Sequence, residues 1–428
     1  LRMSRGLGDV YKRQLYDRED DSFYLVRDRI GKKPLYYWLT GEGIVFGSEL
    51  KPIMKCPGFE KHIRTEVISR YLYHQYINAP DTIFEDVYKL EPGAVLQFQE
   101  GRKSTWKYWD VKTVYQEKKA QPVTDYAEAK EELKNLLKRS VSLRMIADVP
   151  LGTFLSGGYD SSLVTAVAQD LKSEPVKTFS IGFNEEKYNE AKFAKEVAKH
   201  LGTNHTEVYI SEKEMFDLVA SIPKYYDEPF ADSSQIPSML VAELARKDVT
   251  VVLSGDGGDE FFCGYNAYDK VGQAQKLDVL GGMTYGFCNL PGIRNTALLD
   301  KLPFKVRIIA KNRDKETKTQ FGADSYLYTA NHMVKGDGIS ILYPIEQAYG
   351  EKNWQERRML LDMDTYLPGD ILCKVDRATM KYSLEARCPI MDKDVMEYSY
   401  RLPHSFKYGN HIKTVSYTHL RAHETCAD

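Results

Sequence analysis

A short run of serines, glycines and one aspartate has the composition of a phosphate-binding loop. Residues 156–162 read SGGYDSS, follow an apolar run that ends at Leu155, and precede a segment with helical periodicity. Gly157 and Gly158 allow positive φ and leave backbone N–H groups uncovered, so the loop and the following helix N-terminus can hold an anion. Asp160 would be repelled by a bound phosphate unless a cation such as Mg²⁺ lay between them. We therefore predict a phosphate site rather than a plain Ser/Gly turn, although the spacing differs from the Walker A loop.

A second glycine-rich loop has the same setting. An apolar, β-branched run at residues 249–253 leads into residues 254–260, which read SGDGGDE. Because ligands of open parallel sheets bind at the carboxyl ends of the strands, the two loops are expected to face one crevice. Asp256, Asp259 and Glu260 repel one another unless a metal ion or a cationic group balances them. The alternative is that these acids only complement the positive end of a helix.

A third group consists of cations in the last quarter of the chain. Lys374, Arg377 and Lys381 have the spacing of one helix face, and Arg387 follows them. If they faced the crevice, they would hold a phosphate or a carboxylate. Composition alone favours an ordinary stripe exposed to water.

The elements that would position these groups differ between two parts of the chain. From Leu15 to about Asp110, short β-rich runs alternate with turns, and a hairpin is predicted across residues 40–43. Residues 111–123 are polar and are interpreted as a linker. From residue 124 strands and helices alternate, which predicts an α/β fold with a parallel sheet flanked by helices and a helical part after about Asn266. The expected elements are a helix beginning at Thr124 or Asp125, helices at 161–171 and 189–201, and strands at 149–155, 176–183, 206–210 and 249–253.

Composition narrows the class of protein. The chain has 428 residues and a formal charge of −2, which argues against a general nucleic-acid binder. It holds no long apolar stretch typical of a membrane span or signal peptide. Six Cys residues without a CxxC pair are expected to be reduced thiols in a cytoplasmic protein. A basic run at residues 305–318 is interpreted as a solvated helix face.

The two ends resemble translated adapter sequence more than they resemble their neighbours. Residues 1–14 and 415–428 show no periodicity that continues into the adjoining segments. We expect them to be non-native or disordered tails without function.

The three segments together resemble the asparagine synthetase B family, the glutamine-dependent asparagine synthases. The strings that carry the resemblance are SGGYDSSL, DEPFADSS, LSGDGGDEFFCGY and KVDRATMKYSLEARCP, with RDRIGKKPLYY and FGSE in the N-terminal part. The resemblance implies a partial, β-rich α+β glutamine amidotransferase domain of the N-terminal-nucleophile type at residues 15–110. It implies an ATP pyrophosphatase domain at residues 124–414.

The resemblance also implies roles for single residues. Asp160 and Asp259 would hold Mg²⁺ on the pyrophosphate of ATP, Asp256 would lie near bound aspartate, and Arg387 would contact a carboxylate or a phosphate. The remaining nucleotide contacts would come from the two loops and their strands: Ser156, Gly157, Gly158 and Ser161 at the phosphates, and Phe154, Leu155, Ile181, Ser254 and Gly255 at adenine and ribose.

The implied reaction converts aspartate, ATP and glutamine into asparagine, AMP, pyrophosphate and glutamate. The expected partners are small molecules, with a homodimer left open, and neither nucleic acid nor membrane. The family's nucleophile is an N-terminal Cys, whereas residue 1 is Leu and the first Cys is Cys56. The resemblance also stops near Thr414, before a Lys that would complete the ATP site. We therefore expect the chain as written to hydrolyse no glutamine and to be impaired as a synthetase.

Three alternatives remain at this point. A related amidotransferase could act on another carboxylate, such as a sugar acid or a peptide, because the loops determine adenylation and say little about the acceptor. A tRNA-modifying ATP pyrophosphatase shares the first loop, but the charge of −2 speaks against an RNA surface. A non-catalytic binding or assembly role is the third.

Overall fold

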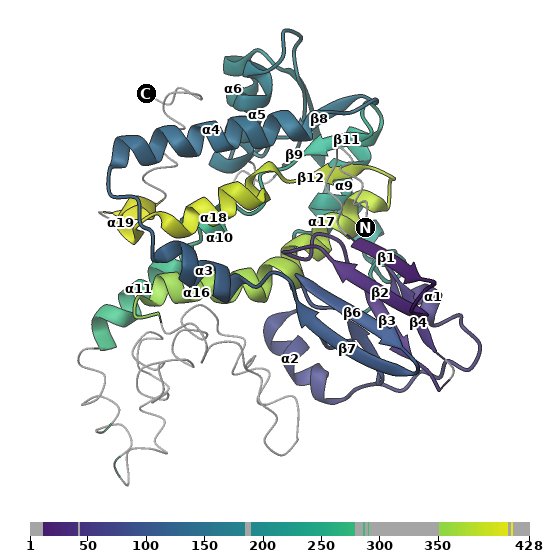
Figure 1. Ribbon diagram of the computed structural model, residues 1–428. Coiled ribbons are helices and arrows are strands. Elements are labelled where there is room, and N and C mark those ends of the chain that lie inside the picture. The colour runs from purple at the N-terminus through teal and green to yellow at the C-terminus, as the bar shows by residue number, and fades with distance from the viewer. Residues whose placement is uncertain are drawn as a thin grey trace.

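The computed structural model describes residues 12–41, 43–184, 190–278, 351–409 and 412–413, together with positions 286 and 290. An N-terminal part with antiparallel sheets packs against a larger part that contains a parallel sheet covered by helices (Figure 1). This mixed α/β architecture confirms the predicted fold class. Within the described residues, no helix is both long and apolar enough to cross a membrane.

Two antiparallel sheets form the N-terminal part. The first has the strand order β1-β2-β6-β7, and the second has the order β4-β3-β5. Their strands are β1 Lys12–Asp17, β2 Ser22–Arg27, β3 Tyr36–Leu39, β4 Ile44–Gly47, β5 Val87–Lys89, β6 Ala94–Gln99 and β7 Arg102–Lys107. The antiparallel pairing of β3 with β4 confirms the predicted hairpin.

Strand β3 separates two small cores because neighbouring side chains of a strand point to opposite faces. Tyr37 packs with Leu25 and Leu96 between the sheets. Tyr36 packs with Leu50 and Val67 on the other side. That second core is closed by helices α1 Leu50–Ile53 and α2 Glu66–His74.

The segment interpreted as a linker forms helix α3 Val111–Lys119. Asp110 caps it by accepting a hydrogen bond from the backbone N–H of Thr113 at 3.0 Å. Val111 and Tyr115 are buried, and α3 packs against the C-terminal helices. The connection between the two parts is therefore a packed helix, and its polar residues form the helix face turned to solvent.

A five-stranded parallel sheet forms the centre of the larger part. Its strand order is β10-β9-β8-β11-β12. The strands are β8 Leu151–Phe154, β9 Lys177–Phe183, β10 Asn204–Ile210, β11 Val251–Leu253 and β12 Glu385–Arg387. The sequence predicted the first four strands. Strand β12 was missed because it lies inside the cationic segment.

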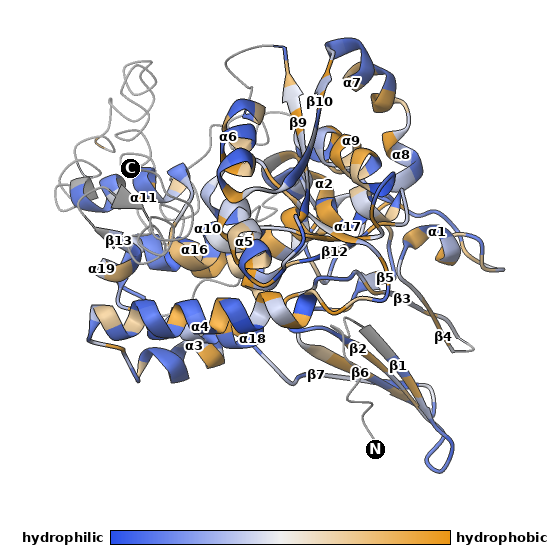
Figure 2. Ribbon diagram, turned by 90° about the horizontal axis from the view of Figure 1, so that it is seen from above, coloured by the Kyte–Doolittle hydropathy of each residue, from blue (hydrophilic) through white to orange (hydrophobic). Residues whose placement is uncertain are grey.

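Helices cover both faces of this sheet. Val251 and Leu253 of β11 belong to the largest core, whereas Val252 belongs to a core on the opposite face. Figure 2 shows α6 and α9 on opposite sides of β9 and β10. The covering helices are α4 Tyr126–Arg144, α5 Tyr159–Asp170, α6 Ala191–Leu201, α7 Glu212–Val219, α8 Ile222–Tyr225, α9 Gln235–Arg246 and α10 Gly258–Phe262.

The remaining described elements are mostly helical, as predicted. They are α11 Asn266–Asp278, α16 Trp354–Asp364, the π-helical turn η4 Leu367–Ile371, α17 Leu372–Met380, the 3₁₀ turn η5 Pro389–Met391, α18 Lys393–Arg401, α19 His404–Lys407 and the strand pair β13 Tyr408–Gly409 and β14 Ile412–Lys413.

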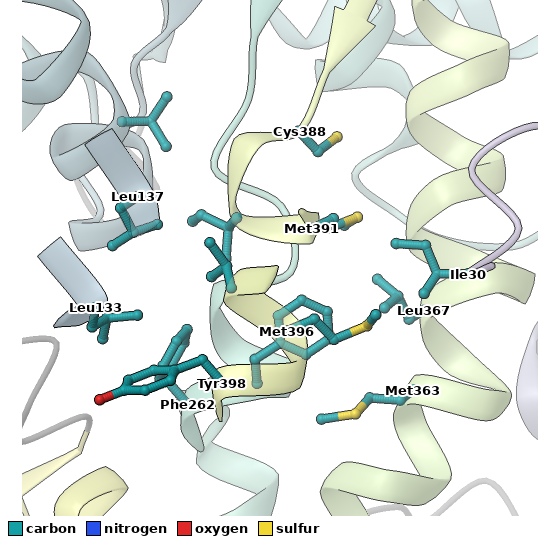
Figure 3. Packing of buried hydrophobic residues seen from close by; sticks show 14 of the residues in the cluster. Ile30, Leu133, Leu137, Phe262, Met363, Leu367, Cys388, Met391, Met396 and Tyr398 are labelled. Atoms are coloured by element: carbon teal, nitrogen blue, oxygen red, sulfur yellow. The ribbon is translucent and has the colours of Figure 1, made fainter. Parts of the chain in front are cut away.

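The largest core joins elements that are distant in the sequence. Leu133 and Leu137 of α4 face Met396 and Tyr398 of α18 in Figure 3. Ile30 from the N-terminal part belongs to the same core. Asp125 caps α4 by accepting the N–H of Glu128 at 2.7 Å, as the sequence predicted. The largest core therefore includes a residue of the N-terminal part and joins the two parts of the molecule.

One expectation about the ends needs correction. Residues 12–14 of the expected N-terminal tail lie in strand β1, because their backbone pairs with β2. Residues 1–11, the expected C-terminal tail at 415–428 and the basic run at 305–318 lie outside the described residues.

Candidate active site

The first glycine loop connects β8 to α5 as predicted. Gly157 has φ +81°, and a Cβ there would lie 2.6 Å from the backbone nitrogen of Ala194 in α6. Gly158 does not need positive φ: it has φ −69° and precedes the first turn of α5. The hydroxyls of Ser161 and Ser162 donate to its carbonyl oxygen at 3.1 and 2.7 Å. These bonds fix the loop and leave its outer surface to a ligand.

The second glycine loop connects β11 to the short helix α10. Gly257 has φ +97°, a conformation that side chains rarely adopt, so this position requires glycine. Ser254 donates its hydroxyl to the carboxylate of Asp256. The Asp256 side chain is therefore bound to a residue of its own loop.

The two loops touch because β8 and β11 are adjacent parallel strands that end at the same edge of the sheet. A Cβ at Gly255 would lie 2.6 Å from the backbone nitrogen of Ser161. A Cβ at Gly258 would collide with the carboxylate of Asp160, and one at Gly264 would collide with that of Asp259. Glycine is thus needed where each loop carries a carboxylate into the space between them.

A cavity of about 680 Å³ opens at this edge of the sheet. Nearly every residue that the sequence assigned to the site lines it. These are Phe154, Leu155, Ser156, Gly158, Asp160, Ser161, Ile181, Ser254, Gly255, Asp256 and Asp259. Gly157 is not among the lining residues because it faces α6, and it contributes by shaping the loop.

Amino-acid composition did not predict that Lys374 faces the cavity. It lies on α17, only 9 % exposed, and is the single cationic side chain among the described residues that line the cavity. Its Nζ donates to Asp232 Oδ2 at 2.7 Å and to Ser234 Oγ at 2.7 Å. Burial alone would lower the pKa of Lys374, but the charge of Asp232 raises it, so the side chain stays cationic. The expectation that these cations form an exposed stripe is therefore wrong for Lys374.

The other cations have structural partners. Arg377 is also buried and binds Asp227 at 3.1 Å and the carbonyl oxygen of Ser48 in the N-terminal part at 3.2 Å. Lys381 lies over the ring of Tyr225.

Arg387 is not among the residues that line the cavity, so its expected role as a carboxylate or phosphate contact is not supported. Its guanidinium donates to the carbonyl oxygens of Arg144 and Ile146 at 2.9 and 2.8 Å and to Glu385 at 2.8 Å. As part of β12, it ties the edge of the sheet to the end of α4. A periodic pattern of cations could not distinguish this role from that of Lys374.

Two acids of the second loop have shifted pKa values. Burial raises the pKa of Glu260 to about 8, and the charge of Asp259 acts in the same direction, while a 2.7 Å hydrogen bond from the Tyr265 hydroxyl opposes it. Burial also raises the pKa of Asp256, and the hydrogen bond from Ser254 opposes it. Neutralisation of Glu260 near pH 7 relieves the repulsion that the sequence implied for these acids.

Residues 227–234 connect the cavity to the N-terminal part. The buried carboxylate of Asp227 accepts the N–H of Leu50 at 2.9 Å and pairs with Lys51 and Arg377. Glu228 pairs with Lys89. Asp232 and Ser234, a few residues later, hold Lys374 at the cavity. One segment thus binds the N-terminal sheets at one end and lines the candidate site at the other.

Comparison with known proteins assigns both parts of the chain. A family model described as asparagine synthase matches residues 132–415, and one described as a glutamine amidotransferase domain matches residues 3–109. Asparagine synthetase [glutamine-hydrolyzing] 1 of Bacillus subtilis is 32 % identical over 407 residues, which is 92 % of this chain and 62 % of the relative. A putative asparagine synthetase [glutamine-hydrolyzing] 2 of Methanocaldococcus jannaschii is 38 % identical over 310 residues, or 69 % of this chain and 58 % of the relative. The chain spans about 60 % of the length of these relatives. Because the first family model covers well over half of the chain, the protein belongs to the asparagine synthase family.

Proposed function

We propose that the protein acts as a glutamine-hydrolysing asparagine synthase. ATP would adenylate the β-carboxylate of aspartate, and ammonia from glutamine would then displace AMP. The observation that carries this proposal is the meeting of two glycine loops, with Asp160 and Asp259, in one cavity at the carboxyl edge of a parallel sheet. We also propose the division into an amidotransferase domain at 15–110, a link at 111–123 and a synthetase domain at 124–414.

In this proposal the nucleotide lies along the two loops. The phosphates lie against Ser156, Gly158 and Ser161 at the N-terminus of α5. The N–H groups of Ser156 and Gly158 donate to Ser161 Oγ and Ser156 Oγ within the loop, and a bound phosphate would take the place of these acceptors. The adenine and ribose lie against the remaining cavity residues of the sequence prediction, which are Phe154, Leu155, Ile181, Ser254 and Gly255. Gly157 supports this arrangement indirectly through its conformation.

Asp160 and Asp259 are suited to hold Mg²⁺. Within the described part of the chain, no group of three or more His, Cys, Asp or Glu side chains is close enough to form a metal centre. The two carboxylates of Asp160 and Asp259 fit Mg²⁺ bound to a nucleotide, because this ion commonly takes only one or two carboxylates together with phosphates and water. When bound, the ion would neutralise charge on the leaving pyrophosphate.

The acceptor would lie at the other side of the cavity. Asp256 and Lys374 both line the cavity, and the charge of each affects the pKa of the other. A carboxylate is a poor electrophile, so it must be joined to AMP before ammonia can attack. Lys374 would bind an anionic group of the substrates, and Asp256 would lie near the amino acid.

Ammonia must arrive unprotonated, which favours an enclosed route from the amidotransferase part. Pockets of about 30 and 10 Å³ at the interface between the parts are lined by Tyr36, Gly369 and Cys373 among others. A further interface pocket of about 220 Å³ is lined by Ile30 and Met363 among others. The direct contact between the two parts supports the proposed route. A cytoplasmic location and a homodimer stay predictions.

The test is isotope exchange between pyrophosphate and ATP that depends on L-aspartate and Mg²⁺. We expect the Asp160→Ala variant to lose at least about 100-fold of the exchange rate, as is typical when a fixed group that stabilises the transition state is removed. Asp170→Ala is the matched control, because Asp170 is an exposed acid at the other end of α5. Exchange that needs a different acid instead of aspartate, or that survives in Asp160→Ala, would overturn the proposal.

A further inference from the structure

Lys374 has one donor left for a ligand. An ammonium group has three N–H bonds, and Lys374 uses two of them on Asp232 and Ser234. Both of these partners lie on residues 227–234, while the side chain itself lines the cavity. The third N–H is therefore available to an anionic group bound there. How strongly it attracts that group depends on the charges behind it.

Behind Lys374, the carboxyl groups of Asp232 and Asp370 are in hydrogen-bond contact. Two carboxylates in contact repel each other unless one of them is protonated. Asp370, on the π-helical turn η4, is 3 % exposed and shares a hydrogen bond with the carboxyl group of Asp232. Asp232 also accepts the N–H and the hydroxyl of Ser234, both at 2.7 Å, as well as the bond from Lys374. These three donors stabilise Asp232 as the anion, so we infer that Asp370 is the protonated partner. Oδ1 of Asp370 has no hydrogen-bond partner among the described residues.

The charges around Asp370 keep this proton in place near neutral pH. Burial raises its pKa to about 8, the charge of Asp232 adds to that effect, and Lys374 opposes it. Burial would raise the pKa of Asp232 as well, but Lys374 lowers it to about 2. The other ionisable groups that act on Asp370 are Glu260, which raises its pKa, and the phenols of Tyr226 and Tyr366.

We propose that Asp370 is a positioning residue whose proton keeps Lys374 available to an anionic substrate group. With the proton present, Lys374 and Asp232 together are neutral. When the proton is lost, the three side chains carry a net negative charge, which repels an anion in the cavity. The proposal rests on the proposed function, in which the anion is a phosphate of the nucleotide or a carboxylate of the amino acid.

The experiment compares the full chain with the Asp370→Asn variant. Asparagine has the same shape, can donate to Asp232, and stays neutral at all pH values. Binding of inorganic pyrophosphate and of L-aspartate is measured by calorimetry for both proteins at about pH 6.5 and about pH 9, on either side of the raised pKa. The two probes separate a phosphate from a carboxylate as the anion. The affinity ratio of the two proteins at each pH cancels the titration of the probe itself.

We expect the two proteins to bind equally at the lower pH and the variant to bind one probe about tenfold more tightly at the higher pH. The control is Asp364→Asn. Asp364 is another buried acid, with its pKa raised to about 7 by burial, but it lies beside Lys107 and away from this cavity. It should not change either ratio.

A ligand-free measurement distinguishes the role from simple packing. A raised carboxyl pKa stabilises the folded state at low pH, and that contribution is lost as pH rises towards about 8. The thermal unfolding midpoint of the wild type should therefore fall, relative to that of Asp370→Asn, as the pH rises from about 4 to about 8. If both proteins bind the probes and the ratio of their affinities is the same at the two pH values, the role of Asp370 is overturned and the proposed nucleotide site is not affected. Absence of pyrophosphate binding at either pH would overturn the nucleotide site as well.

Discussion

The cavity has two walls that are built in different ways. One wall consists of the two glycine loops, where Asp160 and Asp259 are placed by strand ends and by glycines that leave room for them. The other consists of Ser234 with parts of α9 and α17, where Lys374 is placed by its bonds to Asp232 and Ser234, which are far away in the sequence. The first wall depends on local backbone shape, and the second depends on long-range charge pairing. Substitutions in the glycine loops should therefore mainly weaken binding, and substitutions in the buried ion pairs behind the second wall should mainly lower stability.

The largest effect is expected behind the second wall, from Asp227→Ala. The side chain of Asp227 is buried and pairs with Arg377 and Lys51. Its removal leaves the buried Arg377 with only the more exposed Glu49 as a carboxylate partner, and breaking a buried pair typically costs about 3–5 kcal/mol in the free energy of unfolding. Urea unfolding measures this loss. Asp217→Ala is the control, because Asp217 forms an exposed pair with Lys213, and its unfolding midpoint should stay unchanged. An equal, small effect of both variants would remove the distinction between the walls.

A smaller free-energy effect, but a specific one, is expected at the first wall from Gly258→Ala. The added Cβ would collide with the carboxylate of Asp160. We expect ATP binding to weaken about 100-fold, or about 2.7 kcal/mol, with little change in the urea midpoint. Gly41→Ala serves as the control, since a Cβ there meets nothing within 4 Å. If Gly258→Ala bound ATP normally, the close approach of the two loops would not matter for the nucleotide.

The smallest effect on ligands is expected from Arg387→Ala. Arg387 donates to Glu385 and to two carbonyl oxygens at the end of α4. Its loss should cost about 1–2 kcal/mol in stability and leave the dependence of exchange on aspartate unchanged. The measurement is the aspartate concentration that gives half-maximal exchange. A severalfold rise in that concentration would return Arg387 to the site.

The first wall could be predicted from the sequence because its information is local. Residues 156–161 and 254–259 combine an apolar strand, a glycine and an acid within a few positions, and nearly all of these residues line the cavity. The strands β8, β9, β10 and β11 and the cap of α4 at Asp125 were predicted from periodicity and turn chemistry for the same reason.

Only the tertiary structure decided which cation faces the ligand. Lys374 and Arg387 belong to one short, similarly charged segment, yet one is drawn inward by Asp232 and the other is held by backbone carbonyls of α4. The contact between the carboxyl groups of Asp232 and Asp370 could not be predicted either, because neither residue alone indicates a pair. Burial of a charge depends on partners that approach through the fold, and the free energy of such a pair belongs to both residues. The sequence by itself therefore determined the loops and their chemistry, and the packing of the chain determined the charges that surround them.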